Sequence, residues 1–112
     1  MTEAFVWFHN DSEKPKESKA FYETLLGWKP TDGPVGMTMF AGDKGPFAGL
    51  SAKGGPNAGW VPYVQVEDVD TATTKAVKLG ASVVKEKTRG PAGEFTVVRD
   101  PGGASIALWQ KA

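Results

Sequence analysis

The chain has 112 residues, 40% of them hydrophobic, which is enough for one domain with its own core. It contains no cysteine, so a disulfide framework, a thiolate zinc site and a cysteine nucleophile are all excluded. The 13 basic and 13 acidic residues cancel and are mixed along the sequence, so we expect no nucleic-acid binding.

The sequence also carries signals of location. The first five residues have neither a positively charged region nor an apolar one, so no signal peptide is expected. No apolar run approaches the roughly 18 residues of a membrane span. Together with the absence of cysteine, these features predict a cytoplasmic protein that makes no membrane contact.

The first predicted element is a strand over residues 5–9, which are aromatic and β-branched. The turn-forming residues 10–12 follow it, and Asp11 or Ser12 is expected to cap a helix over 15–26. Pro15 suits the first turn of that helix. The first module therefore begins as a strand followed by a helix.

Apolar residues of the helix fall on one face. Phe21, Tyr22 and Leu25 have helical spacing, which predicts that they belong to the core. Gly27 is the expected C-terminal stop. Three short strands are then predicted, within residues 28–35, 36–41 and 46–52.

The same order of elements repeats after a glycine-rich linker. A strand over 60–66 precedes a helix capped by Asp68 or Asp70 and ended by Gly80. Three strands over 81–85, 94–98 and 105–109 follow, separated by turns at 89–93 and 100–103.

The repeat predicts an α+β fold of two βαβββ modules within one domain. Leu26–Gly27 and Leu79–Gly80 occupy the same place in the two halves, where a helix ends and a strand begins. The expected domain covers residues 1–112. Its parts are module one at 1–53, the linker at 54–59 and module two at 60–112.

Three local motifs resemble those of the vicinal oxygen chelate superfamily, which includes glyoxalases, bleomycin-resistance proteins and extradiol dioxygenases. They lie at residues 19–28, at 64–70, and at 99–103 with 106–110. The resemblance covers nearly the whole chain. It implies curved sheets with the helices on their convex sides, and a cleft formed by the two concave sides.

The resemblance also says where metal ligands would lie, on the first and fourth strands of each module. Those positions match Val61 and Ala107 in the second module and fall nearest Phe5 in the first. The remaining strand offers nothing better than Ser51. Hydrocarbon side chains cannot bind a cation, so we expect neither a family-type metal site nor a cofactor.

His9 is the single histidine of the sequence and the first candidate for catalysis. A histidine facing the cleft could exchange a proton near neutral pH, with Glu94 as its partner in acid–base chemistry. The alternative is that His9 is a partly exposed residue at a strand end, hydrogen-bonded to a loop. Glu94 could equally be a solvated side chain.

Four tryptophans in a chain of this size suggest a ligand cleft rich in aromatic rings. Methionines could adapt such a cleft to ligands of varied shape. The alternative is that the rings fill the core or a dimer interface. The predicted ligand-binding residues are Trp7, His9, Met37, Met39, Phe47, Trp60, Tyr63, Gln65 and Trp109.

Three functions compete on these grounds. The first is a metal-free protein that binds a small planar or apolar molecule in an aromatic cleft. The second is a glyoxalase-like enzyme that uses His9 or a metal at unexpected positions. The third is an interaction module in which exposed aromatic residues make a homodimer, the commonest oligomer in general.

Overall fold

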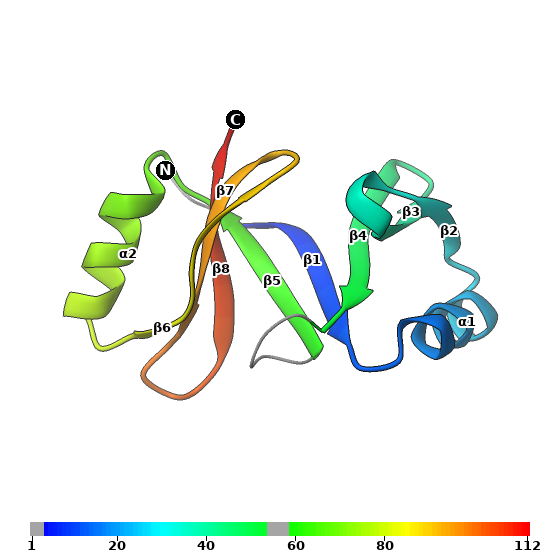
Figure 1. Ribbon diagram of the computed structural model, residues 1–112, viewed down its shortest axis with the longest axis horizontal. Coiled ribbons are helices and arrows are strands. Elements are labelled where there is room, and N and C mark those ends of the chain that lie inside the picture. Colours follow the sequence, from blue (N-terminus) through cyan, green and yellow to red (C-terminus); the bar gives the residue numbers. More distant parts are fainter. Residues whose placement is uncertain (1–3, 54–58) are drawn as a thin grey trace. The chain divides into compact units, whose positions relative to one another are not determined.

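The computed structural model describes residues 4–53 and 59–112, and most of the predicted linker lies outside them. The described chain is α+β and runs through two βαβββ modules, as the sequence predicts (Figure 1). The first module holds β1 (Phe5–Ser12), α1 (Pro15–Leu26), β2 (Lys29–Asp32), β3 (Thr38–Gly42) and β4 (Gly45–Ala52). The second holds β5 (Gly59–Gln65), α2 (Val69–Lys78), β6 (Ser82–Gly90), β7 (Gly93–Arg99) and β8 (Ser105–Lys111).

The chain forms two compact units. One consists of Trp7–Trp60 and is called the N-terminal unit below. The other consists of Val61–Ala112 together with the segment that ends at Val6, and is called the C-terminal unit. Each unit has its own strands, helix and core.

In the N-terminal unit the strands lie in the order β2-β3-β4-β1, with β1 parallel to β4 and the other neighbours antiparallel. The prediction that residues 10–12 form a turn is wrong. Asn10, Asp11 and Ser12 extend β1 and pair with Leu50, Ser51 and Ala52 of β4. Pairing with β4 outweighs the local turn preference of these side chains.

α1 begins at Pro15 without the predicted cap, because Lys14 holds the N-cap position and makes no side-chain capping bond. Ser12 Oγ instead accepts a hydrogen bond from the Lys14 amide at 3.0 Å and contacts Ser18 Oγ at 2.7 Å. Gly27 ends the helix as predicted, with a φ of 70° that favours glycine.

The prediction that the apolar face of α1 belongs to the core is mostly wrong. Phe21 is 57% exposed and Leu25 is 62% exposed, and no residue of α1 is buried. Tyr22 alone among the three predicted core residues packs against the buried cluster of the unit. That cluster consists of Phe40, Ala48 and Leu50, with Trp28 and Phe47 packed against it.

In the C-terminal unit the strands lie in the order β5-β8-β7-β6, with β5 parallel to β8. α2 covers one face of these strands, where Val69, Val98 and Leu108 are buried together. The face turned away from α2 has its own cluster of Val61, Val97 and Ala107. Figure 1 shows α2 beside β6, β7 and β8.

The helix cap and the tight turn predicted for this unit are both present in the structure. Asp68 caps α2 by accepting a hydrogen bond from the Thr71 amide at 2.9 Å. Asp100 Oδ1 accepts from the Gly102 amide at 2.8 Å and closes the predicted turn. β6 is longer than predicted, because its residues up to Gly90 pair with β7. Among the residues that the structure describes, no helix is long and apolar enough to cross a membrane.

Candidate functional site

Strand β1 presents three polar or aromatic side chains on one face. Trp7, His9 and Asp11 alternate along the strand and therefore point to the same side. His9 and Asp11 pair with Gly49 and Ser51 of the parallel strand β4. We call this surface the β1–β4 face.

The opposite side of the same strands is occupied by the core. Phe8 and Asn10 pair with Ala48 and Leu50, and Asn10 is only 6% exposed. Along the second half of β1, Asn10 and Ser12 are therefore buried, whereas His9 and Asp11 on the other side are half-buried. The sequence predicts this division for Trp7 and His9, and misses it for Asp11, which resembles a turn residue.

The imidazole of His9 is the centre of the β1–β4 face. Its Nε2 atom lies 2.7 Å from Ser51 Oγ, which is a short hydrogen bond. The same nitrogen lies 3.9 Å from Asp11 Oδ1. On the other side of the ring, Trp7 Nε1–H donates to His9 Nδ1 over 3.5 Å. Three partners of its own unit therefore orient the ring.

Gly49 makes room for that ring. A Cβ atom at this position would stand 2.7 Å from His9 Nδ1 and 3.0 Å from Met37 Sδ. The imidazole and the thioether therefore lie against the backbone of β4. Met39 pairs with Gly49 from strand β3, so it shares this face. A glycine within a strand usually lowers the stability of that strand. In the structure, Gly49 lies directly against the His9 imidazole and leaves space for it.

The arrangement is not that of a serine nucleophile. A Ser-His-Asp triad needs the carboxylate on one ring nitrogen and the hydroxyl on the other. Here Ser51 and Asp11 both approach Nε2, and an indole N–H faces Nδ1. The group can orient a hydrogen bond or exchange a proton through His9, but Asp11 does not hold the ring for attack by Ser51.

Two predicted ligand-binding residues lie on the α1 side of the N-terminal unit. Phe47 packs edge-on against Trp28, with ring centroids 4.9 Å apart, at the point where the β3–β4 register shifts. Trp60 Nε1–H donates to Tyr22 Oη at 2.9 Å. Neither residue joins the β1–β4 face, because both are held by the aromatic cluster beneath α1.

Three further predicted residues lie on the C-terminal unit, on the face turned away from α2. Tyr63 pairs with Ala107, and Gln65 pairs with Trp109. The Tyr63 and Phe95 rings lie 5.5 Å apart. This second face is more apolar than the β1–β4 face and carries its own aromatic side chains.

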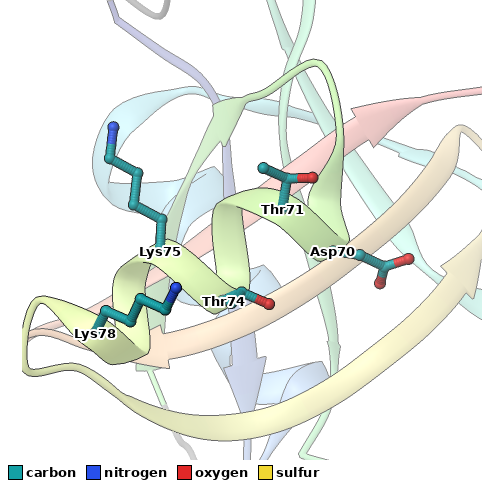
Figure 2. A pocket seen from close by; sticks show the side chains of 5 residues that line it. All are labelled: Asp70, Thr71, Thr74, Lys75 and Lys78. Carbon is teal, nitrogen blue, oxygen red and sulfur yellow. The ribbon is translucent and has the colours of Figure 1, made fainter.

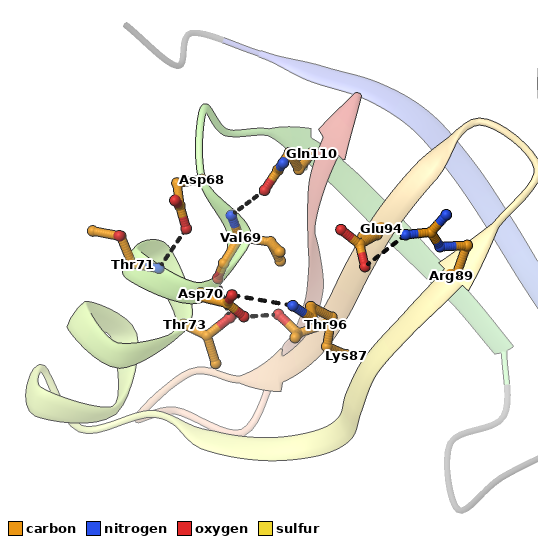
Figure 3. A network of polar contacts seen from close by, with 10 residues as sticks. All are labelled: Asp68, Val69, Asp70, Thr71, Thr73, Lys87, Arg89, Glu94, Thr96 and Gln110. Carbon is orange, nitrogen blue, oxygen red and sulfur yellow. Dashed lines mark hydrogen bonds and ion pairs between the residues drawn. The ribbon is translucent and has the colours of Figure 1, made fainter. Parts of the chain in front are cut away.

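Glu94 lies on the side of β7 that faces α2. It shares that side with Thr96, which hydrogen-bonds Thr73 of α2 at 2.8 Å. Its carboxylate lies 3.8 Å from the guanidinium of Arg89, as Figure 3 shows. The pairing of Glu94 with His9 in acid–base chemistry has no support from this placement, and it stays a prediction.

A shallow hollow also runs along the outer surface of α2 (Figure 2). Its lining residues are Asp70, Thr71, Thr74, Lys75 and Lys78, all from the one helix. Among these lining residues, none comes from a second element that would close over the hollow. We therefore do not treat it as a ligand site, because bound ligands are mostly surrounded by protein.

Val61 and Ala107, the two positions that the resemblance matches to metal ligands in the second module, carry hydrocarbon side chains. Val61 is 2% exposed and Ala107 is fully buried, and they lie in one cluster with Val97. Within residues 4–53 and 59–112, no group of three or more His, Asp or Glu side chains could hold a metal ion. The donor set does not fit the metal of the superfamily.

Comparison with known proteins decides the family. The model of the glyoxalase-like domain matches residues 7–109. The chain belongs to the glyoxalase-like domain family. The fold agrees, since a glyoxalase/bleomycin resistance protein/dioxygenase superfamily member from Vibrio splendidus has a TM-score of 0.67, at 14% identity and full coverage of both chains.

Two curated relatives resemble this glyoxalase-like domain over most of its length. "Putative glyoxylase CFP32" of Mycobacterium bovis is 31% identical over 93% of the chain, and the match covers 44% of that protein. Anthracycline biosynthesis protein DnrV of Streptomyces peucetius is 27% identical over 95% of the chain and 46% of that protein. The chain thus spans less than half the length of these relatives.

Proposed function

We propose that this glyoxalase-like domain binds a small planar organic molecule on the β1–β4 face, without the metal of the superfamily. The observation that carries the proposal is the short contact between His9 Nε2 and Ser51 Oγ, 2.7 Å, beside the indole of Trp7. This group combines a flat apolar ring with oriented polar atoms. Ligand sites are commonly built in that way.

The neighbours of this group suit a flat ligand. Gly49 leaves the floor of the face without a side chain, and Met37 lies beside the imidazole. Thioether side chains adapt to the shape of what they contact. The buried hydrocarbon at Val61 and Ala107 supports binding without a metal, because neither residue can supply a ligand atom.

One relative supports the planar ligand. DnrV is named for anthracycline biosynthesis, and anthracyclines carry a fused, largely flat ring system. A ligand of that class would offer a broad surface to Trp7. Since the match covers 46% of DnrV, the likeness bears on this domain alone.

Calorimetric titration with the anthracycline doxorubicin tests the proposal. We expect Trp7→Phe to weaken binding about tenfold, because an indole in a binding site contributes on the order of 1.4 kcal/mol. The matched control is Trp60→Phe, which also replaces an indole but on the α1 side. No binding by the wild type, or equal losses in both variants, would contradict the proposal.

An enzyme is the second candidate, because His9 could exchange a proton with a bound molecule. Its described partners are then Ser51 and Asp11 in place of the predicted Glu94. Elemental analysis of the purified protein separates the two candidates. Stoichiometric metal would overturn the argument from Val61 and Ala107, and turnover lost in His9→Gln without any metal would favour the enzyme.

A homodimer is supported by a different observation, the exposed apolar side chains of α1. Phe21 and Leu25 lie one turn apart, and each is more than half exposed. The curated relatives have room for a second domain of this size, since the match covers only 44% of CFP32. We propose that a second copy of the chain covers this helix face.

A further inference from the structure

The hydrogen atoms of the His9 contacts follow from the chemistry of Trp7. An indole N–H can donate and cannot accept. Because Trp7 Nε1 faces His9 Nδ1 at 3.5 Å, that ring nitrogen is the acceptor. A neutral imidazole has one donor and one acceptor nitrogen, so Nε2 carries the hydrogen. His9 therefore donates to Ser51 Oγ across 2.7 Å.

The Ser51 hydroxyl is the next group in this series. A hydroxyl has one hydrogen and two lone pairs. When Ser51 Oγ accepts from His9, its own hydrogen is directed elsewhere. The series then runs from the Trp7 indole through the His9 ring to the Ser51 hydroxyl, and each member donates to the next.

We propose that the Ser51 hydroxyl donates the hydrogen bond that orients the ligand, and that the ligand is a planar aromatic molecule with a carbonyl oxygen. The inference rests on the proposed binding function of the β1–β4 face. A carbonyl oxygen accepts without donating, which matches a hydroxyl whose lone pair already faces His9.

Gly49 fixes the direction of the series. Because the His9 ring lies against the β4 backbone, with Met37 Sδ beside it, the ring has little freedom to rotate. The hydrogen on Nε2 is therefore aimed at Ser51 before a ligand arrives. A donor held in advance binds more strongly than one that must be ordered.

The tautomer of His9 can be read without any ligand. The sequence has one histidine, so selective ¹⁵N-histidine labelling gives NMR signals from a single ring. We expect the neutral ring to carry its proton on Nε2, and Trp7→Phe to increase the share of the other tautomer. A wild-type ring protonated on Nδ1 would overturn the proposal.

Binding is tested with fluorenone and fluorene, two neutral tricyclic molecules that differ by one carbonyl oxygen. We expect the wild type to bind fluorenone more tightly, and Ser51→Ala to lower that affinity about tenfold while leaving fluorene binding unchanged. Ser82→Ala, an exposed serine of β6, is the matched control and is expected to change neither affinity.

The outcomes separate this inference from the function on which it rests. Equal affinity for fluorenone and fluorene, unchanged in Ser51→Ala, would overturn the hydrogen-bond inference and leave the planar site standing. Failure of both molecules to bind would overturn both. Loss of both affinities in Ser51→Ala would also contradict the inference, because it would mean that the serine supports the structure of the face.

Discussion

At the scale of single residues, Gly49 controls the position of His9. A methyl group there would stand 2.7 Å from Nδ1 and 2.9 Å from Cε1 of the imidazole. We expect Gly49→Ala to displace the ring, break its contact with Ser51 and destabilise the fold by about 1–3 kcal/mol, the usual cost of overpacking. Denaturant unfolding and the histidine NMR signals of the labelled protein measure the two effects.

Gly42→Ala is the matched control for that substitution. Its added methyl group would meet only ring carbons of Phe47 at 3.7 Å, an ordinary contact. We expect this variant to keep the wild-type histidine signals. If Gly49→Ala also kept them, the β4 backbone would not be what holds the imidazole in place.

Residue types in the sequence were enough to single out Trp7, His9, Met37 and Met39, but not Asp11 and Gly49. Asp11 has a turn-forming side chain, and its role depends on pairing with Ser51, a residue far away in the chain. Gly49 weakens a strand on its own. The reason for a glycine at position 49 is the His9 imidazole, which β1 places against it. No local sequence pattern reveals that contact.

At the scale of elements, the start of α2 should make stability depend on pH. The hydrogen bond from the Thr71 amide holds the pKa of the Asp68 carboxyl below its ordinary value of 3.8. A carboxyl with a lowered folded pKa stabilises the fold fully above the unfolded value, and this contribution is lost as the pH falls through the folded value. The loss therefore begins near pH 3.8 and continues below it.

Asp68→Asn isolates this effect, because asparagine caps a helix about as well as aspartate but does not ionise. We expect the two proteins to have similar thermal stability near pH 6 and the wild type to lose more on acidification to about pH 2. Asp68→Ala should be less stable at every pH. A parallel decline of wild type and Asp68→Asn would show that other carboxyls account for the acid sensitivity.

A second element-scale prediction concerns the link between α2 and β7. Thr73 Oγ1 donates to the Val69 carbonyl at 2.6 Å and lies 2.8 Å from Thr96 Oγ1 (Figure 3). Thr96 is only 3% exposed, so Thr73→Val leaves its buried hydroxyl without that partner. We expect a loss of about 1–3 kcal/mol in the free energy of unfolding, measured with denaturant.

The double variant Thr73→Val with Thr96→Val should recover part of that loss, because it removes both hydroxyls together. Thr74→Val, on the exposed surface of the same helix, is the control for β-branching and is expected to change stability little. Additive losses in the double variant would mean that the two hydroxyls do not depend on each other.

At the scale of the whole molecule, the order of elements could be predicted because it rests on turns, caps and periodicity within each segment. The packing of α1 against the rest of its unit could not be predicted from the sequence. Its helical spacing predicts an apolar face, but spacing does not say what covers that face. In α2 the corresponding face buries Val69 against Val98 and Leu108, whereas α1 buries none of its residues.

The exposed face of α1 predicts that the protein forms a dimer. Exposed apolar side chains that lie together commonly mark an interaction surface. If a second copy covers this face, Phe21→Ser with Leu25→Ser should shift the wild-type dimer to monomer in sedimentation experiments. The control is Val77→Ser on α2, which removes a side chain that is 49% exposed and should leave the dimer intact.

The monomeric variant also tells whether dimerisation and ligand binding are separate properties. The β1–β4 face is built from strands of one unit, and His9 contacts Trp7, Asp11 and Ser51 within that unit. We therefore expect the Phe21→Ser, Leu25→Ser protein to keep its affinity for fluorenone. A wild-type protein that sediments as a monomer at every concentration would remove the dimer, and loss of binding on conversion to monomer would show that the site needs the second copy.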